Sequence, residues 1–342
     1  MKIKIAVFAY NEENNIGYLI KKLASQSIFN NSNYEVQCHL LVNGCSDSTA
    51  VKAEENIMNL CADIKEKFCL HVLEEGGKSR TWNFFVHDIL EEETEYTFFI
   101  DADIKLTNDN QLFSMLKLIV TSKSIDVVNS KPIKDISYNR KKLTFIEKLI
   151  VASSNKLDNS NAICGQLYLI KASKIRNISM PVGLPVEDGF LCAMIKTNLL
   201  TSPDTTSNII NDNTIFHVYE SIVTVSELIE HQTRIVIGGA INKVIFDHIN
   251  EFDNSVKYRE IILKNISSTP DWLGLFLDNK LPMLPYGYVP FSFLLKRLTN
   301  FSKSQNKSIM SILILSIGVC FDFLVYARAS YKMSRGTAAG HW

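Results

Sequence analysis

The chain is poor in features that would place it in several common protein classes. Its 342 residues include only 7 cysteines, and no two of them form a C-x-x-C pair. An odd number of scattered cysteines in a chain of this length argues against a disulfide framework and against a zinc cage. We therefore expect buried thiols and a protein of the reducing cytoplasm.

An excess of charge of one sign is also missing. Lys and Arg together number 36, as do Asp and Glu together, and no long basic run compensates locally. Nucleic-acid binding usually requires a positive field or a basic stripe. We therefore expect no nucleic-acid partner.

What the chain does contain is a repeated order of strand and helix. Alternating or continuous apolar residues predict strands over 3–9, 36–42, 68–73 and 97–100, and helical spacing predicts helices over 16–23, 48–60, 79–90 and 112–119. The first apolar stretch is too short for the core of a signal peptide. This alternation predicts an α/β fold with a mostly parallel sheet flanked by helices.

Two aspartates stand directly after the fourth predicted strand, at Asp101-Ala102-Asp103. Open α/β sheets bind ligands beyond the carboxyl ends of their strands. Carboxylates one residue apart at such a point can reach one hard divalent cation, Mg²⁺ or Mn²⁺, and through it a diphosphate. An acidic pair can also be solvated or cap a helix, but its position after a buried strand favours the metal site.

Five sequence blocks, in order and spacing, resemble family 2 glycosyltransferases of the GT-A fold over residues 3–234. They are Ala9-Tyr10-Asn11-Glu12, the segment 42–49 with Asn43 and Asp47, Gly77-Lys78 with Asn83, Asp101-Ala102-Asp103, and Glu187-Asp188. Each block is weak alone, and their common order makes the resemblance specific. The resemblance implies a nucleotide-sugar donor bound by the first three blocks together with Asp101 and Ala102.

The resemblance also assigns roles in the reaction. It implies that Asp101 and Asp103 hold the metal, that His217 is a third ligand, and that Asp188, beside Glu187, is the base of an inverting transfer to a hydroxyl group. Arg234 lies in a degenerate form of the family's glutamine-any-any-arginine-tryptophan block and would stabilise the leaving diphosphate. The missing tryptophan of that block argues against a processive enzyme.

Two positions leave alternatives open. The family usually has an acidic residue where this chain has Asn43, and an amide can still pair with a pyrimidine edge. We expect a UDP-sugar, with guanosine and cytidine donors left open. Asp47 precedes a predicted helix, so it either caps that helix or contacts the ligand. Lys78 is expected at the phosphate or base of the donor.

The last part of the chain differs from the rest. Residues 309–327 are apolar except for small or polar residues and Asp322, close to the roughly 20 residues that a bilayer crossing needs. A surface-lying anchor, a crossing and a core helix all remain open. We expect a catalytic domain over 1–245, with a nucleotide-sugar half (1–105) and an acceptor half (106–245), followed by a helical region over 246–342.

These expectations together describe a cytoplasmic enzyme at the cytoplasmic face of a membrane. Its acceptor would be a glycan or a lipid-linked glycan of the cell envelope. Two other functions remain: a nucleotidyltransferase acting on sugar phosphates, and a non-catalytic nucleotide-sugar binder. The first usually has a glycine-rich basic loop where this chain has Tyr10-Asn11-Glu12-Glu13.

Overall fold

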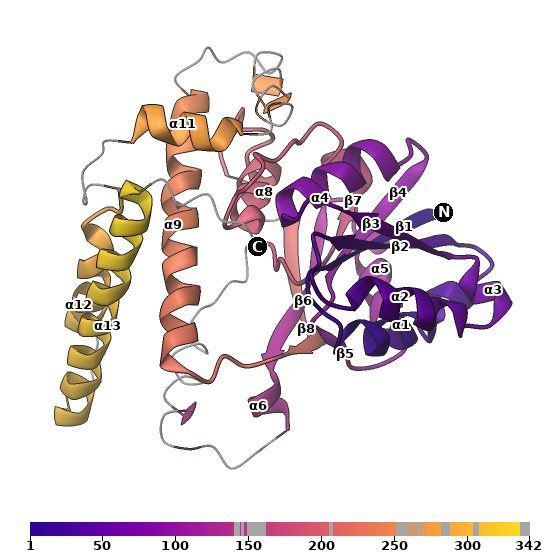
Figure 1. Ribbon diagram of the computed structural model, residues 1–342, viewed down its shortest axis with the longest axis horizontal. Coiled ribbons are helices and arrows are strands. Elements are labelled where there is room, and N and C mark those ends of the chain that lie inside the picture. The colour runs from indigo at the N-terminus through magenta and orange to yellow at the C-terminus, as the bar shows by residue number, and fades with distance from the viewer. Residues whose placement is uncertain are drawn as a thin grey trace.

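A single eight-stranded sheet forms the centre of the molecule (Figure 1). The computed structural model describes residues 1–139, 144, 147–148, 162–204, 208–250, 259–260, 263–264, 266, 269, 271–281, 288–303 and 308–335. The strands are β1 Lys2–Ala9, β2 Glu35–Asn43, β3 Phe68–Leu73, β4 Thr94–Asp101, β5 Lys105–Leu106, β6 Val127–Lys134, β7 Leu167–Lys171 and β8 Ile209–Tyr219. The four strands expected in the first hundred residues are thereby confirmed.

The strand order in the sheet is β3-β2-β1-β4-β7-β6-β8-β5. The first four strands are parallel to one another, as are β6 and β8, whereas β7 is antiparallel to both its neighbours and β5 is antiparallel to β8. The order of the parallel strands reverses between β1 and β4, which is where open α/β sheets bind ligands. The segments after Ala9 and Asp101 both begin at this point.

Helices cover both faces of the sheet. They are α1 Ile16–Ala24, α2 Thr49–Met58, α3 Ala62–Lys65, α4 Lys78–Phe84, α5 Gln111–Thr121, α6 Asp135–Tyr138, α8 Glu187–Lys196, α9 Val225–Asn250, α11 Trp272–Lys280, α12 Ser292–Lys303 and α13 Ile309–Ser334, with short helical turns η1 Ser27–Asn30, η2 Phe85–Ile89 and η3 Ala172–Lys174. Apolar spacing also predicts a helix over 143–154, a segment that lies mostly outside the described residues. α9 continues across the domain boundary expected at residue 245.

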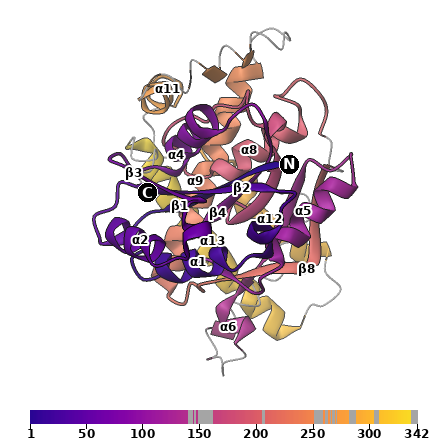
Figure 2. The ribbon, with the colours of Figure 1, turned by 90° about the vertical axis from the view of Figure 1, so that its right-hand side faces the viewer.

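Two apolar cores lie on opposite faces of the sheet (Figure 2). Successive residues of β1 alternate between them: Ile5 and Val7 face α1, α2 and α5, whereas Phe8 faces α4, α8 and α9. This alternation follows from the two-residue repeat of a strand. Phe99 of β4 stands in the second core, with its ring centroid 4.9 Å from that of Tyr168.

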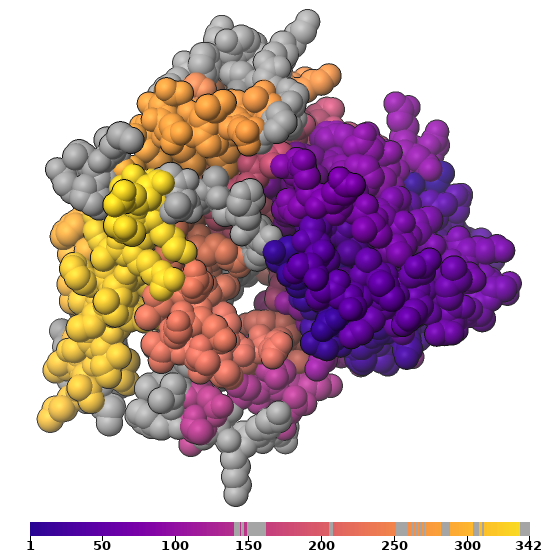
Figure 3. Space-filling model, viewed as in Figure 1, coloured from indigo at the N-terminus to yellow at the C-terminus, as the bar shows by residue number. Residues whose placement is uncertain are grey.

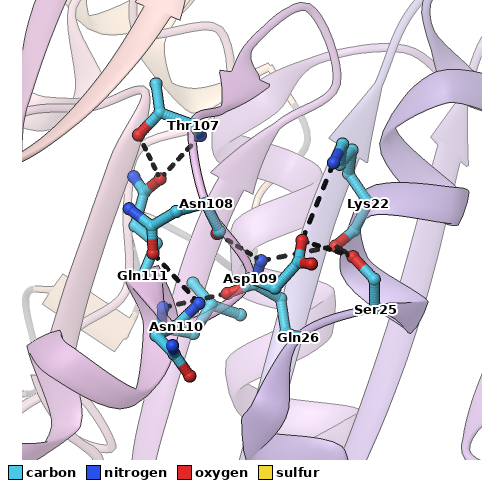
Figure 4. Close-up of polar contacts among 9 residues, drawn as sticks. Lys22, Ser25, Gln26, Thr107, Asn108, Asp109, Asn110 and Gln111 are labelled. Atoms are coloured by element: carbon cyan, nitrogen blue, oxygen red, sulfur yellow. Dashed lines mark hydrogen bonds and ion pairs between the residues drawn. The ribbon is translucent and has the colours of Figure 1, made fainter.

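A buried polar network fixes the start of α5 (Figure 4). The Nε2 of Gln26 donates to the carbonyl of Asn108 at 2.9 Å, and its Oε1 accepts from the backbone N–H of Leu112 at 3.1 Å. Gln111 accepts from the N–H of Thr107 and donates to Ser130 Oγ at 3.2 Å. The amide side chains therefore take the place of water at a buried helix start.

The C-terminal helices lie apart from the sheet. α12 and α13 run side by side at the outer edge of the molecule, and α9 stands between them and the sheet (Figures 1 and 3). Within the described part of the chain, Ser311–Ser334 is the one helix long and apolar enough to cross a membrane, judged by length and composition only, and only 17% of its most apolar window is buried. This low burial argues against an ordinary core helix.

Candidate active site

The first and second loops at the carboxyl edge are joined by hydrogen bonds. Asn11 has a positive φ of 54°, and its Oδ1 accepts from the backbone N–H of Ser46 at 2.9 Å. The N–H of Glu12 donates to Thr49 Oγ1 at 2.7 Å. Tyr10 is 39% exposed, and Asn11 is exposed as well. The two loops therefore form one unit.

Asn43 connects three segments of the edge. Its buried amide donates from Nδ2 to the carbonyl of Ala9 at 3.0 Å, and its Oδ1 accepts from the N–H of Gly77 at 3.0 Å. Both ends of the side chain are thus bonded to the protein backbone. In this arrangement Asn43 positions the loops, and its contact with a nucleotide base stays a prediction.

Asp47 bonds at the start of α2. Its Oδ1 accepts from the N–H of Thr49 at 3.0 Å, and its Oδ2 accepts from the N–H of Glu13 at 3.1 Å. Burial on its own would raise the pKa of Asp47, but the hydrogen bonds from Thr49 and Glu13 lower it. Of the two alternatives for this residue, the structure shows the helix-capping contacts.

The second and third loops touch backbone to backbone. Gly44 has a φ of +56°, and a Cβ placed there would lie 2.5 Å from the backbone nitrogen of Gly76. Any larger side chain would clash with that backbone, so the position requires glycine. This contact sets the distance between the loop after β2 and the loop that leads into α4.

Lys78, the first residue of α4, is the centre of the charged cluster. Its Nζ lies 2.7 and 2.8 Å from the two carboxylate oxygens of Asp101, 3.0 Å from Glu187 Oε1 and 3.2 Å from the carbonyl of Gly165. Burial would lower the pKa of Lys78, but the charges of Asp101 and Glu187 outweigh it and raise that pKa. One ammonium group therefore joins acids that are 86 residues apart in the sequence.

The two aspartates after β4, Asp101 and Asp103, differ in their contacts with the rest of the protein. Burial raises the pKa of Asp101 to about 7 although Lys78 lowers it, and burial also raises the pKa of Asp103. Asp103 Oδ1 is buried and accepts no hydrogen bond from any part of the chain that the structure describes. A buried carboxylate oxygen without a donor is costly unless a cation or water meets it.

Glu187 and Asp188 open α8, as the sequence predicts. Burial and the neighbouring charge of Glu187 raise the pKa of Asp188, whereas Lys78 and Arg234 lower it. A Cβ built on Gly165 would lie 3.1 Å from the Asp188 carboxylate, so this glycine leaves room for the acid. The second acidic block thus reaches the same edge as the first.

Arg234 comes to the cluster from α9. Burial lowers its pKa, and the charges of Glu187, Asp188 and Asp101 act against this lowering. α9 is fixed beside this segment because a Cβ on Gly238 would lie 2.3 Å from Val186. Arg234 therefore lies within electrostatic reach of the acidic cluster, and its contact with a leaving diphosphate stays a prediction.

Comparison with known proteins supports this arrangement of blocks. Residues 4–195, more than half of the chain, match the family described as glycosyl transferase family 2. The chain belongs to this family. No curated protein matches the sequence.

Solved structures show the fold of this family 2 glycosyltransferase. A mannosyltransferase from Pyrobaculum calidifontis in complex with GDP-Man and Mn²⁺ is 15% identical, with 96% of this chain and 86% of that chain covered and a TM-score of 0.55. A glucosyl-3-phosphoglycerate synthase from Mycobacterium tuberculosis in complex with Mg²⁺ and UDP is 14% identical, with 72% and 79% covered and a TM-score of 0.48. The likeness to the first confirms the expected GT-A fold.

Two expected site residues of this family 2 glycosyltransferase have protein partners. His217 is fully buried, with Nδ1 2.9 Å from Ser130 Oγ and Nε2 3.2 Å from Gln166 Oε1, and burial lowers its pKa to about 3. Asn83 donates to the carbonyl of Met180 and accepts from its N–H, both at 2.8 Å. Among the described residues, no group of three or more His, Cys, Asp and Glu side chains is arranged to hold a metal ion.

Two contributors to the site were not predicted. The carbonyl of Gly165 accepts from Lys78, and the carbonyl of Gln166 accepts from the N–H of Asp101 at 2.9 Å. Both precede β7, whose antiparallel position beside β4 brings them to the edge. The one local sign is the glycine itself, which is too weak to identify a site.

Proposed function

We propose that this family 2 glycosyltransferase transfers a sugar, with inversion and non-processively, from a nucleotide-diphosphate sugar to a hydroxyl group. A UDP-sugar is our first choice of donor. The observation that carries the proposal is that Lys78 bonds both Asp101 of the first acidic block and Glu187 of the second. This contact puts the expected metal-binding and base-bearing segments at one point of the sheet edge.

The aspartates fit a divalent cation. Asp101 and Asp103 supply the hard oxygen ligands that Mg²⁺ or Mn²⁺ prefers, and Asp103 Oδ1 is buried without a donor in the described chain. When bound, the cation would supply positive charge for the diphosphate. The similar mannosyltransferase is a complex with GDP-Man and Mn²⁺, which supports the choice of cofactor. His217 would join as a ligand only by exchanging its contact with Gln166 or Ser130.

Lys78 and Arg234 would bind the diphosphate from the protein side. Both are partly buried cations beside the acids, so their charge is screened less than that of surface residues. As the bond from the sugar to the diphosphate breaks, negative charge grows on the leaving group. Fixed positive groups at that position stabilise the transition state more than the bound donor.

Asp188 is the proposed base. A raised pKa brings a carboxylate closer to the operating pH, where it takes a proton from an attacking hydroxyl more readily. The charges of Lys78 and Arg234 act in the opposite direction and lower that pKa. The acceptor hydroxyl would approach from the side of α8, where Asp188 stands at the first turn.

The proposed acceptor is a glycan or lipid-linked glycan at the cytoplasmic face of a membrane, in the synthesis of the cell envelope. Two features support this part: the apolar exposure of α13, and Ile235 in the place of the tryptophan that polymerising relatives have after the arginine. The acceptor half of the site is partly built by α9, which also packs against α13.

A donor-hydrolysis screen tests the proposal. UDP-, GDP-, dTDP- and CMP-sugars would be offered with and without Mn²⁺ to the full chain and to Asp103→Ala and Asp188→Ala. We expect metal-dependent release of nucleotide that Asp103→Ala abolishes, and loss of turnover with retained nucleotide binding in Asp188→Ala.

Other outcomes distinguish the remaining functions. Tight nucleotide binding with no turnover on any donor would indicate a binding protein. Pyrophosphate release from a nucleoside triphosphate and a sugar phosphate would indicate a nucleotidyltransferase. Undiminished turnover in Asp188→Ala would remove this residue from the role of base.

A further inference from the structure

The hairpin formed by α12 and α13 exposes most of its outer surface to solvent. No residue of α12 is buried, and none of residues 311–321 of α13 is buried. The second half of α13 differs, because Val325 is buried and Ala329 and Met333 are buried in the core that includes α9. α13 is thus anchored to the protein at one end, and its apolar first half faces solvent.

The exposed surface of this half is strongly apolar. Ile309 is 89% exposed, and Ile312, Leu313, Ile314 and Ile317 are each about half exposed, from 49% to 58%. Contiguous exposed apolar surface of this kind marks an interaction site on most soluble proteins. No other helix in the described chain combines such length and hydropathy.

Charge indicates what kind of partner covers it. Residues 288–335 hold seven Lys and Arg but a single acidic residue, although the two signs are equal in number over the whole chain. That acid, Asp322, is buried and paired with Arg297 of α12 at 2.5 Å. Within the described part of the chain, no carboxylate pairs with Lys296 or Lys303. Apolar surface flanked by unpaired lysines complements an anionic lipid headgroup layer.

α13 as a whole is long enough to cross a membrane, but the charge of Asp322 and the pairing of its second half with α9 argue against a crossing. The uncharged run 309–321 is 13 residues, or about 20 Å of helix, whereas the hydrocarbon core of a bilayer is about 30 Å thick. Beyond that run, Arg328 and Lys332 are paired with Glu230 of α9 at 2.9 and 3.0 Å. α13 could cross a membrane only by giving up these contacts.

We propose that the α12–α13 hairpin docks on the surface of an anionic bilayer and inserts residues 309–321 into one leaflet without crossing it. The inference rests on the proposed membrane association and specifies its surface, its depth and its lipid. Glu230 stands one helical turn before Arg234 on α9, so the docked hairpin would hold the catalytic edge at a fixed distance from the membrane.

The cysteines of the chain provide a direct test. Cys320 lies on the exposed part of α13, and Cys61 is exposed beside α3, far along the chain. The full-length protein would be labelled with an environment-sensitive fluorophore in Cys61→Ser and, as the matched control, in Cys320→Ser. Preformed vesicles of phosphatidylcholine alone or with phosphatidylglycerol are then added, with no donor present.

We expect the emission of the Cys320 label to rise severalfold and shift to the blue with the phosphatidylglycerol vesicles, and the Cys61 label to stay unchanged. Lys296→Gln and Lys303→Gln should each weaken binding by about 5-fold. Leu313→Glu with Ile317→Glu should abolish it, whereas Val51→Glu, an equally exposed apolar position on α2, should have no effect.

Several results would overturn the proposal. One is an unchanged emission of the Cys320 label with both kinds of vesicle, and another is vesicle binding by the Leu313→Glu/Ile317→Glu variant that equals that of the parent protein. A third is insertion that occurs only from detergent and leaves residues on both sides of the bilayer. The last is a lipid-free dimer that already shields Cys320. Turnover on a soluble acceptor is measured separately. Lost docking with intact turnover refutes only the docking surface, and intact docking without turnover refutes only the proposed function.

Discussion

The β1–β4 half and the α12–α13 hairpin are both rich in apolar residues but differ in what those residues contact. Ile5, Leu40 and Phe98 of the sheet are fully buried, whereas Leu313 of the hairpin is 55% exposed. In the sheet half, polar loop side chains such as Asn43 are also bonded to backbone from other loops. The comparison shows that the hydropathy of a segment predicts that its side chains must be shielded from water. The topology of the fold decides whether another part of the protein provides that shielding.

The difference also separates two tasks. A site that binds charge needs groups whose positions do not change, and the bonded loops provide them. A surface that meets a fluid layer needs no fixed partner within the chain. Substitutions should therefore have large effects at the sheet edge and small effects on stability in the hairpin.

The largest expected effect is on catalysis at the sheet edge. Asp188→Asn should lower kcat by about 10²-fold to 10⁴-fold because it removes the proton acceptor. Its thermal stability should stay the same or rise, since the protein disfavours the charged form of Asp188. In the unsubstituted enzyme, activity should rise with pH through the raised pKa of this residue. Steady-state kinetics across pH and thermal melting measure these effects. A kcat of Asp188→Asn within twofold of the parent enzyme would contradict the role of Asp188 as the base.

A matched pair of truncations tests the comparison directly. Leu40→Ala empties space in a closed core and should lower the free energy of unfolding by about 2–5 kcal/mol. Leu313→Ala removes the same atoms from an exposed site and should change it by less than about 0.5 kcal/mol. Denaturant titrations without lipid measure both. Equal losses would mean that the hairpin is packed against something in solution.

The bonded loops can be tested in the same way with polar residues. Asn43→Leu leaves the N–H of Gly77 without its partner and removes the amide donor from the carbonyl of Ala9, which should cost about 1–3 kcal/mol. Asn300→Leu, at an exposed position of α12, is the control and should be close to neutral. If the two variants melt alike, Asn43 does not hold the loops together.

The smallest expected effect concerns acid stability of the sheet half. His39 Nδ1 lies 3.0 Å from His71 Nε2, and burial, with a smaller contribution from Lys4, lowers the pKa of His39 to about 3. Above pH 6.5 the histidine is neutral in both states, so it has no effect on the pH dependence.

Between pH 6.5 and 3 the unfolded chain binds a proton that the folded chain does not, so stability falls as the pH falls, by at most about 1.4 kcal/mol per pH unit. Urea titrations at pH 7 and 5.5 measure this slope. His39→Gln should flatten it, and an unchanged slope in that variant would assign the acid sensitivity to other groups.

Much of the fold could be predicted because its signals are local. Strands β1 to β4, helices α1, α2, α4 and α5, the start of α8 at Glu187, and α9 follow from residue periodicity and from turn or cap residues. The short elements α3 and β5 were not predicted. The place of β7 could not be predicted, because nothing in its five residues specifies that it runs antiparallel between β4 and β6. Gly165 and Gln166 were missed for the same reason.

The candidate site shows the same division. The family resemblance was enough to select Asp101, Glu187 and Lys78, but the ion pairs of Lys78 with Asp101 and Glu187 depend on side-chain packing between segments 23 and 109 residues apart. Asn43 and Asn83 were expected at the ligand, and the structure shows them bonded to backbone. An amide side chain is suited to either role, so only its surroundings decide between them.

The bonds of Asn83 to Met180, and of Ser79 to the N–H of Gly183, have a consequence for hybrid enzymes. They tie α4, which belongs to the nucleotide-sugar half, to the segment that leads into α8. Because the partners at positions 180 and 183 are backbone groups, a chimaera that takes residues 1–105 from a relative with another donor keeps these bonds only if that relative has Asn at position 83 and Ser at position 79. Donor exchange in this protein therefore requires these two side chains to be retained in the transplanted piece.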